Sequence, residues 1–405
     1  MTNLPQGWEV KTLSEIGEII TGSTPSKSNV EFYGKDYPFF KPSDFEQGYF
    51  LENAGDNLSK LGFGKARQLP PKTILVVCIG SLGKVALTRV IGSCNQQINA
   101  IIPHKNIISE YIYYYCISSK FQSILFSKAP QTTLAIFNKT EFSKLEIIYP
   151  KDIKKQERIV GILDESFAKI DESIKILEQN LLNLDELMQS ALQKAFNPLK
   201  DNAKENYKLP QGWEWKSLGE IGEIITGTTP SKNNPNFYGN EYPLFKPSDL
   251  NGDMIIKYAS DNLSKLGFDN ARNLPKDTIL VVCIGASIGK VGLSGVNGSC
   301  NQQINAIIPN SAFTSKYLFF VCLSNYFQEI LKNNASQTTL PIINKTEFSK
   351  LQIPLPPIKE QEQITSHLDE LSSHVKNLKQ NYQAQIKDLQ ELKNSLLDKA
   401  FKGNL

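Results

Sequence analysis

The chain repeats most of its own sequence at a spacing of about 205 residues. Residues 5–44 and 210–249 are identical at 30 of 40 aligned positions. The decapeptide CNQQINAIIP occurs at Cys94–Pro103 and again at Cys300–Pro309, and NKTEFSK also occurs twice. This period is too long for the unit of a solenoid. The repeat therefore predicts a duplicated domain with a duplicated connector, an arrangement suited to a target with two parts.

Bulk composition is that of an ordinary globular protein. The 405 residues are 40% hydrophobic and 21% charged, which predicts two or three domains with cores of their own. Neither a run of ~18 apolar residues nor a secretory signal is evident. Six cysteines lie in apolar stretches without a C-x-x-C pair, so we expect structural thiols in a reducing cytoplasm. We expect no membrane association.

Charge is spread unevenly but weakly. Residues 1–150 hold 15 basic and 12 acidic side chains, and residues 206–358 hold 13 and 11, which leaves net charges of +3 and +2. A basic bias favours a polyanionic partner. A solvated surface would show the same small excess, so charge alone does not decide between them.

Each half begins with a mixed part, which we place at residues 1–150 and 206–358. Short apolar runs predict buried strands at Thr73–Gly80 and Gln97–Ile102, and at their repeats. Apolar residues at three- and four-residue steps predict a helix near Ser109–Leu125 and another near Ser315–Leu331. We therefore expect two similar mixed α/β domains.

Each half ends with a helical part, which we place at residues 151–205 and 359–405. A linker near 198–209 connects the first helical part to the second half. The first shows one apolar seam: Leu163, Phe167, Ile170, Ile174, Leu177, Leu181, Leu184, Met188, Ala191 and Ala195. The second shows another: Ile364, Leu368, Leu371, Val375, Leu378, Tyr382, Gln385, Leu389, Leu392, Leu396 and Lys399. A 3.5-residue period is typical of a coiled coil.

Pairing of the two helices has more than one solution. We expect helices of roughly 40 residues and ~60 Å that pair antiparallel within the chain and separate the two domains, with a pseudo-twofold axis across the coil. The alternative is that each helix packs on its own domain or on a partner chain.

Catalytic and metal-binding patterns are weak. The three histidines, His104, His367 and His374, do not recur in the repeat, and no cluster has zinc spacing. The glycine turns with Lys84 and Lys290 lack the spacing and the hydroxyl of a phosphate loop. We expect no catalytic residue and no metal site. Asp44 and Asp249 are expected to cap a turn or helix.

Polar residues at matched positions are the candidates for contact with DNA. Amides read adenine edges, and basic side chains contact phosphates or guanine. The alternatives are solvated lysines, a plain hairpin at each glycine turn, and local capping by the Asn-Gln-Gln runs. The candidates are Lys27, Lys41, Lys60, Arg67, Lys84, Gln96 and Gln131 in the first half, and Lys232, Lys246, Lys265, Arg272, Lys290, Gln302 and Gln337 in the second.

An ordered set of motifs resembles the specificity subunit of type I restriction–modification systems. The set is P-Q-G-W-E, I-x-T-G-x-T-P-S, F-K-P-S-D, ILVVCIG with its G-K turn, N-Q-Q-I-N-A-I, Q-T-T-L and a closing E-Q-x-x-I. It covers essentially the whole chain, in order and twice. The first half departs once, because Lys155 stands where the family usually has Glu.

The resemblance implies two target-recognition domains held apart by two spacer helices. Each domain would read one half of a bipartite site in double-stranded DNA. The helices would set the unread gap and dock methyltransferase subunits, two of them by expectation. The chain itself would be non-catalytic and without cofactor. Methyl transfer from S-adenosylmethionine, and translocation and cleavage with ATP and Mg²⁺, would belong to methyltransferase and restriction subunits.

The likeness of the two halves has a consequence for the target. Similar surfaces in inverted orientation predict related half-sites, even an interrupted palindrome. Phe45–Asp56 and Leu250–Asp261 differ strongly, however, and so do residues 104–130 and 310–336. If these segments reach the bases, the half-sites differ. Two alternatives for the function are the recognition chain of a type IIB or IIG system, and a coiled-coil adaptor without a DNA role.

Overall fold

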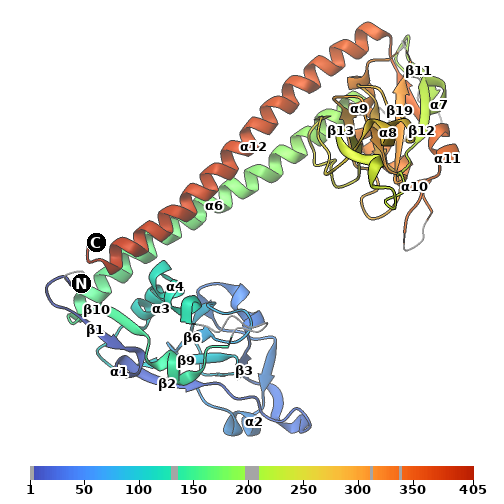
Figure 1. Ribbon diagram of the computed structural model, residues 1–405. Coiled ribbons are helices and arrows are strands. Elements are labelled where there is room, and N and C mark those ends of the chain that lie inside the picture. The colour runs from blue at the N-terminus through green and yellow to red at the C-terminus, as the bar shows by residue number, and fades with distance from the viewer. Residues whose placement is uncertain (1–3, 129–135, 197–208, 311–312, 337–339) are drawn as a thin grey trace. The chain divides into compact units, whose positions relative to one another are not determined.

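The computed structural model describes residues 4–128, 136–196, 209–310, 313–336 and 340–405 (Figure 1). Its contacts divide the chain into two compact units, each built from a repeat and from parts of two long helices. The first unit comprises Met1–Leu177 and Gln383–Leu405, and the second comprises Glu178–Tyr382. The predicted linker lies, apart from Leu209, outside the described residues. The domain boundaries drawn from the sequence remain a prediction.

The described residues of the first unit form ten strands in three small sheets. The strands are β1 (Trp8–Thr12), β2 (Gly17–Thr21), β3 (Tyr33–Phe40), β4 (Phe50–Leu51), β5 (Asp56–Leu58), β6 (Ile74–Val77), β7 (Val85–Thr88), β8 (Ser93–Cys94), β9 (Ile98–Pro103) and β10 (Glu146–Pro150). The sheet orders are β2-β9-β6-β7-β4, β5-β3-β8 and β1-β10. Most pairs are antiparallel, and β3–β8 and β4–β7 are parallel.

Helices of the first unit cover and connect these sheets. They are α1 (Leu13–Ile16), α2 (Lys60–Lys65), α3 (Ser109–Ile117), α4 (Ser119–Lys128), α5 (Lys139–Ser143) and the long α6 (Ile153–Phe196), with 3₁₀ turns η1 (Val30–Phe32) and η2 (Pro42–Gln47). The core combines the five-stranded sheet, α3 and α4 with both long helices: Ile74 and Ile101 share one buried cluster with Leu163 and Leu397. The strands predicted at residues 73–80 and 97–102 are confirmed as β6 and β9.

The second unit repeats this plan. Its strands are β11 (Glu214–Ser217), β12 (Gly222–Thr226), β13 (Tyr238–Phe245), β14 (Ile255–Ile256), β15 (Asp261–Leu263), β16 (Ile279–Val282), β17 (Val291–Ser294), β18 (Ser299–Cys300), β19 (Ile304–Pro309) and β20 (Gln352–Leu355). The sheets are ordered β12-β19-β16-β17-β14, β15-β13-β18 and β11-β20. Its helices are α7 (Leu218–Ile221), η3 (Pro235–Phe237), α8 (Lys265–Asp269), α9 (Ser315–Leu323), α10 (Asn325–Asn333), α11 (Lys345–Lys350) and the long α12 (Ile358–Phe401). Two mixed α/β domains, as predicted, are confirmed.

Each helix predicted after the central strands is in fact two helices. Ser118 separates α3 from α4, and Ser324 separates α9 from α10, both with extended backbone. Each serine hydroxyl donates to a carbonyl three residues earlier over 2.6 Å, and accepts the backbone N–H of Phe121 or Phe327. Serine at this position competes with the helical hydrogen bonds and starts a new helix, which apolar spacing alone does not reveal.

The long helices run antiparallel where they meet inside each unit. In the first unit Lys393 of α12 pairs with Asp171 of α6, and Leu397 packs near Leu163. In the second unit Lys379 pairs with Asp185, while residues near the end of α6 pack with the start of α12. The predicted antiparallel pairing of α6 and α12 is confirmed within each unit, and both helices also pack on their domains.

The apolar seam predicted for α12 is wrong in its last third. Gln385 and Lys399 are exposed, and Leu392 is 46% exposed. The inward positions there are Ile386, Leu389, Lys393, Leu396, Leu397 and Ala400. A straight helix of 3.6 residues per turn drifts by ~20° per heptad against a 3.5-residue pattern. Lys393 fits the seam because its ammonium group reaches Asp171 and the ring of Phe167.

A phenylalanine at the end of each long helix completes the core of a domain. Phe401, the last residue of α12, is 6% exposed and lies edge-on to Tyr111 and Tyr115 of the first unit, with ring centroids 5.4 and 5.1 Å apart. Phe196, the last residue of α6, packs on Tyr317 of the second unit at 5.5 Å. Each domain therefore receives a core residue from the helix that begins after the other domain.

The indole of the first tryptophan differs between the two copies. Trp213 donates from Nε1 to Glu360 over 3.1 Å. Trp8 is 6% exposed, and its Nε1 is buried without a hydrogen-bond partner among the described residues. Lys155, at the position of Glu360, lies 5.4 Å from the Trp8 ring centroid and cannot accept a hydrogen bond. The departure of the first half from the family pattern therefore leaves a buried donor unsatisfied.

We predict that Lys155→Glu stabilises the first unit. A hydrogen bond from a buried N–H to a carboxylate is worth about 1.5–3 kcal/mol, and the cation–π contact that is lost is worth about 0.5–1 kcal/mol. The free energy of unfolding, measured by chemical denaturation, should rise by about 1 kcal/mol as the difference of these values. Lys154→Glu makes the same charge change at an exposed neighbour, and an equal gain from it would contradict this account.

Candidate nucleic-acid interface

A polar turn after the first strand of each five-stranded sheet gathers several of the candidates. In the first unit the Thr24 hydroxyl donates to Oε1 of Gln96 over 2.5 Å. In the second, Thr229 and Gln302 make the same bond over 2.9 Å. Both glutamines are exposed, and Lys27 is exposed three residues beyond Thr24. The turn therefore fixes an amide beside a lysine at the surface of each unit.

Two matched lysines each pair with an aspartate, and in the second unit this aspartate also lies near the lysine of the polar turn. Lys41 pairs with Asp56 in the first unit, and Lys246 pairs with Asp261 in the second. Lys232 also approaches Asp261, with Nζ and Oδ2 4.0 Å apart. The hydrogen bond from Lys246 holds the pKa of Asp261 below its ordinary value. These aspartates orient the lysines and reduce the local positive charge.

The lysines at the start of α2 and α8 are exposed. Lys60 donates its backbone N–H to Asp36 over 3.1 Å. Lys265 lies at the matched position, and its ammonium group pairs with Asp269 over 2.5 Å. Both side chains lie at the surface of a short helix, and that of Lys265 is held by Asp269.

The two arginines have different partners. Arg272 donates from Nη1 to the carbonyl of Thr226 over 2.6 Å and from its backbone N–H to Thr228 over 3.2 Å. It therefore joins the polar turn of the second unit. Arg67 is exposed, and its carbonyl accepts from Ser93 over 2.7 Å. Both arginines are exposed, and Arg272 is held to the polar turn by these two bonds.

Lys84 and Lys290 follow the glycine hairpins of their sheets. Each hairpin joins two antiparallel strands, so it is not followed by the helix of a phosphate loop. Lys84 pairs with Glu46, and Lys290 donates to the carbonyl of Pro247 over 3.3 Å. The last candidates, Gln131 and Gln337, lie outside the described residues.

Other polar residues singled out from the sequence have structural roles. Asp44 accepts the backbone N–H groups of Lys41 and Gly55 over 2.7 and 3.0 Å, so the expected turn cap is confirmed. Asn95 accepts the backbone N–H of Gln97 over 3.1 Å, and Nε2 of Gln97 donates to Ile79. The Asn-Gln-Gln run therefore closes local structure through two members and exposes only the middle one, Gln96.

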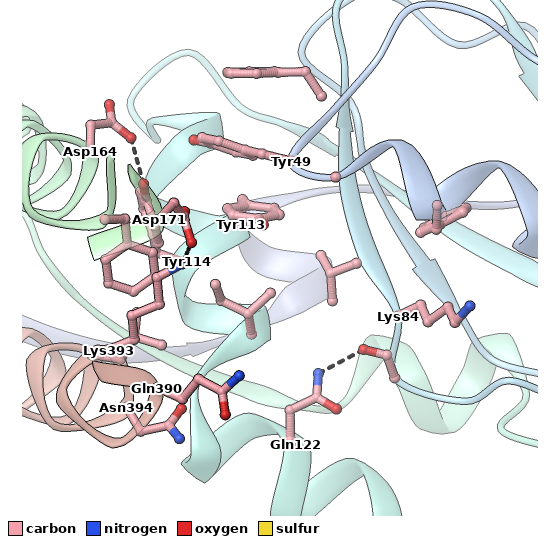
Figure 2. Close-up of a pocket in the computed structure, with 18 of the residues that line it drawn as sticks. Tyr49, Lys84, Tyr113, Tyr114, Gln122, Asp164, Asp171, Gln390, Lys393 and Asn394 are labelled. Carbon is pink, nitrogen blue, oxygen red and sulfur yellow. Dashed lines mark hydrogen bonds and ion pairs between the residues drawn. The ribbon is translucent and has the colours of Figure 1, made fainter. Parts of the chain in front are cut away.

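A cavity of 940 Å³ lies between the domain and the helix pair of the first unit (Figure 2). Tyr49 stacks on Tyr113 with ring centroids 4.0 Å apart, and burial raises the pKa of Tyr113 to about 12. Tyr114 donates to Asp164 over 2.5 Å. The Tyr49 hydroxyl is buried with no partner among the described residues. Apolar residues such as Val85 and Phe167 line the cavity together with further polar side chains, among them Lys84, Gln122, Gln390, Lys393 and Asn394.

The matching position in the second unit is bridged. Lys376 of α12 pairs with Asp253 of the loop before β14 over 2.7 Å. In the first unit these two positions hold Asp171 and Gly48, and Asp171 pairs with Lys393 of the other helix instead. The two copies thus attach the domain to the helix pair by different contacts.

The described residues show no grouping suited to catalysis or metal binding. No cluster of three or more His, Cys, Asp or Glu is placed around a common point among them. Each of the three histidines is exposed. Burial raises the pKa of four thiols to about 12, those of Cys78, Cys94, Cys283 and Cys300. Burial also raises the pKa values of Cys116 and Cys322. None of the described helices is long and apolar enough to span a membrane.

Fold and surface together define a duplicated-domain protein in which two similar α/β domains carry matched polar turns and share two antiparallel helices. The family described as "Type I restriction modification DNA specificity domain" matches residues 5–182 and 210–388. These two matches cover most of the chain. The chain therefore belongs to this family, as its motifs predicted.

Curated relatives agree with the family match. The HindI specificity subunit of Haemophilus influenzae is 38% identical over 191 residues, which cover 46% of this chain and 42% of that protein. The MjaIX specificity subunit of Methanocaldococcus jannaschii is 25% identical over 418 residues, 99% of this chain and 94% of that protein. Both are specificity subunits of type I restriction enzymes. The type IIB or IIG alternative is not favoured.

Solved structures show the same fold. A chain from a study of complex assembly and conformational transition of the type I R-M system matches with a TM-score of 0.82 at 20% identity, over all of both chains. The HsdS subunit from Thermoanaerobacter tengcongensis matches with a TM-score of 0.57 at 20% identity, over 99% of this chain and 98% of that one. At these identities the likeness concerns the fold alone.

We predict that the six thiols are unreactive in the folded protein. Their raised pKa values leave almost no thiolate at neutral pH, and the thiolate is the reactive form. A thiol-reactive disulfide reagent should therefore modify none of the six cysteines in native protein between pH 7 and 8, and all of them in concentrated guanidinium chloride. Rapid labelling of any thiol in the native state would show that its surroundings are open to solvent.

Proposed function

We propose that this chain is the sequence-specific DNA-recognition subunit of a type I restriction–modification complex. Each α/β domain reads one half of a bipartite site in double-stranded DNA. The observation that carries the proposal is the duplicated surface: in both domains the same turn fixes an exposed glutamine beside exposed basic side chains. Membership of the specificity family supports it. An adaptor without a DNA role would not require this polar surface twice.

The helices supply the spacer and the docking surface in this proposal. Large apolar side chains point outward from α6 and α12 at several positions. Ile176 is 55% exposed, Leu182 58%, Leu187 49% and Leu392 46%. Exposed apolar residues on paired helices are the contacts that further helices use for packing. We propose that methyltransferase subunits, two per chain, bind there, and that restriction subunits join the complex they form.

In this proposal the partner subunits catalyse methyl transfer and DNA cleavage. The six thiols are buried, and no cluster of three or more His, Cys, Asp or Glu side chains is placed around a common point among the described residues. We propose that this chain carries no cofactor and is not itself an enzyme. S-adenosylmethionine would serve the methyltransferase subunits, and ATP and Mg²⁺ would serve the restriction subunits. The complex would work in the cytoplasm.

Single-molecule methylome sequencing tests the proposal. Cells with this gene deleted, and the methyltransferase gene intact, should lose one bipartite methylated motif. Restoring the gene on a plasmid should return the motif, which controls for effects on neighbouring genes. An unchanged methylome under confirmed expression would favour the adaptor hypothesis.

A second prediction concerns Lys27 and Lys232. If each contacts a phosphate, Lys→Ala at either position weakens binding of the assembled methyltransferase to duplexes of any sequence. It also reduces the slope of log affinity against log salt by about 1. Fluorescence anisotropy over a salt series measures both quantities. Lys139→Ala removes an exposed lysine of α5 as the control, and an equal change in slope for that variant would exclude a specific contact.

A further inference from the structure

Two adjoining hollows lie on the three-stranded sheet of the second unit. Their volumes are 470 and 380 Å³, and both are lined by Asn240 of β13 and Asn262 of β15. Lys232, one of the DNA-contact candidates, lines the larger. Lys257 and Tyr258, which follow β14, line the smaller. This concave surface therefore begins beside the polar turn and extends to the loop after β14.

The floor of this surface is the same in both copies. Tyr33 and Tyr238 donate to the carbonyls of matched prolines over 2.8 and 2.7 Å. Tyr37 stacks on Phe63 at 3.9 Å, and the matching pair in the second unit stacks at 4.0 Å. Asn57 and Asn262 each donate to a carbonyl three residues earlier, over 3.4 and 3.3 Å. Matched contacts of equal length show that both domains build one scaffold here.

The lining of the same surface differs at seven matched positions, and four of these exchange one sizeable side chain for another of different chemistry. Where the first unit has Lys35, Glu52, Asn53 and Ile91, the second has Asn240, Lys257, Tyr258 and Asn297. These side chains are exposed in both units. Tyr258 is 85% exposed and Ile91 is 52% exposed, so each rim directs a large side chain into solvent. We call these eight residues the rim positions.

The residues beside the rim positions also differ between the two units. In the first unit Arg89 pairs with Glu52 over 2.9 Å and lies 3.7 Å over the ring of Phe50. The second unit has Gly295 at the position of Arg89. A Cβ there would come within 2.7 Å of the side chain of Lys257, so the missing side chain leaves room for this lysine. The two rims are therefore different built surfaces on one scaffold.

Chemistry of the rim positions suits the reading of base edges. Asparagine can make paired hydrogen bonds to adenine, lysine donates to guanine, and an apolar side chain such as isoleucine contacts the methyl group of thymine. A fixed floor with exchanged rim side chains presents different groups to DNA in the same geometry.

We propose that the rim positions determine base specificity, with Asn240, Lys257, Tyr258 and Asn297 reading the half-site of the second domain. Their counterparts read the half-site of the first. The two half-sites consequently differ at the bases that these residues contact, although both domains bind the DNA backbone alike. This inference rests on the proposed function and adds the residues that carry the specificity.

An exchange of the rim tests the inference. The variant carries Asn240→Lys, Lys257→Glu, Tyr258→Asn and Asn297→Ile, which gives the second domain the side chains of the first. Methylome sequencing of cells that express it should show one half of the motif changed and the other half retained. Methylation at the original motif should fall about tenfold or more, because each good base contact contributes a factor of that size.

Controls separate the possible outcomes. Asn325→Ser with Glu329→Ser exchanges two exposed residues of α10 in the same way and should leave the motif unchanged.

If the four-residue variant loses all methylation, the single variant Tyr258→Asn distinguishes misfolding from lost base contacts, because the loss of so exposed a side chain does not disturb the core. A relaxed or altered half-site in that variant supports the inference. An unchanged motif, with normal methylation, overturns it. Absence of any motif that depends on the wild-type gene would instead refute the proposed function.

Discussion

One buried glutamine in the first turn of each long helix fixes that helix to its domain. Gln156 has no exposed surface, and its amide donates to the carbonyls of Asn106 and Pro150 over 3.3 and 2.9 Å. Its oxygen accepts the backbone N–H of Ile108 over 2.9 Å. In the second unit Gln361 likewise accepts the backbone N–H of Thr314 over 3.2 Å and donates to the carbonyl of Pro356, just after β20, over 3.0 Å. A buried amide needs a hydrogen-bond partner for each of its polar groups. These bonds therefore fix the orientation of the long helix relative to the end of the preceding strand and to the loop before the domain's own helices.

The two copies show which parts of the domain tolerate change once this junction is fixed. Strand order and the bond between the threonine of the polar turn and its glutamine are the same in both. The attachment of domain to helices is not: an open cavity beside Tyr49 in one unit corresponds to the pair of Lys376 and Asp253 in the other. The partner of the first tryptophan has changed too, with Lys155 in place of a carboxylate. Differences therefore include the contacts of the domain with the helix pair and the side chains at the rim, while the strand order is kept.

The sequence predicted the buried strands of the repeated scaffold because buried segments contain recognisable runs of apolar residues. The strands at β6 and β16, with all four residues buried in each, appear as unbroken apolar runs. The split between α3 and α4 depends on the hydroxyl group of Ser118, and one serine does not change the apolar pattern from which a helix is predicted. The apolar seam predicted for α12 is wrong near Leu392 because Lys393, which points inward, counts as polar in the sequence although its ammonium group is paired with Asp171.

The sequence alone could not identify the rim positions. The four positions in each unit come from three separate segments, and only the fold shows that they border one hollow. Strong divergence between residues 45–56 and 250–261 was the available signal.

The position of Phe401 in the core of the first unit sets an order for folding during synthesis. The second unit is continuous from Glu178 to Tyr382, so all of its core residues have been made once residue 382 is complete. The first unit lacks Leu397, Ala400 and Phe401 until α12 has been synthesised to its end. The domain that the ribosome makes first is thus the last to complete its core, and for that interval the surface around Tyr111 and Tyr115 lacks its native cover. Such exposed apolar surface is what chaperones bind and what drives misassembly of nascent repeats.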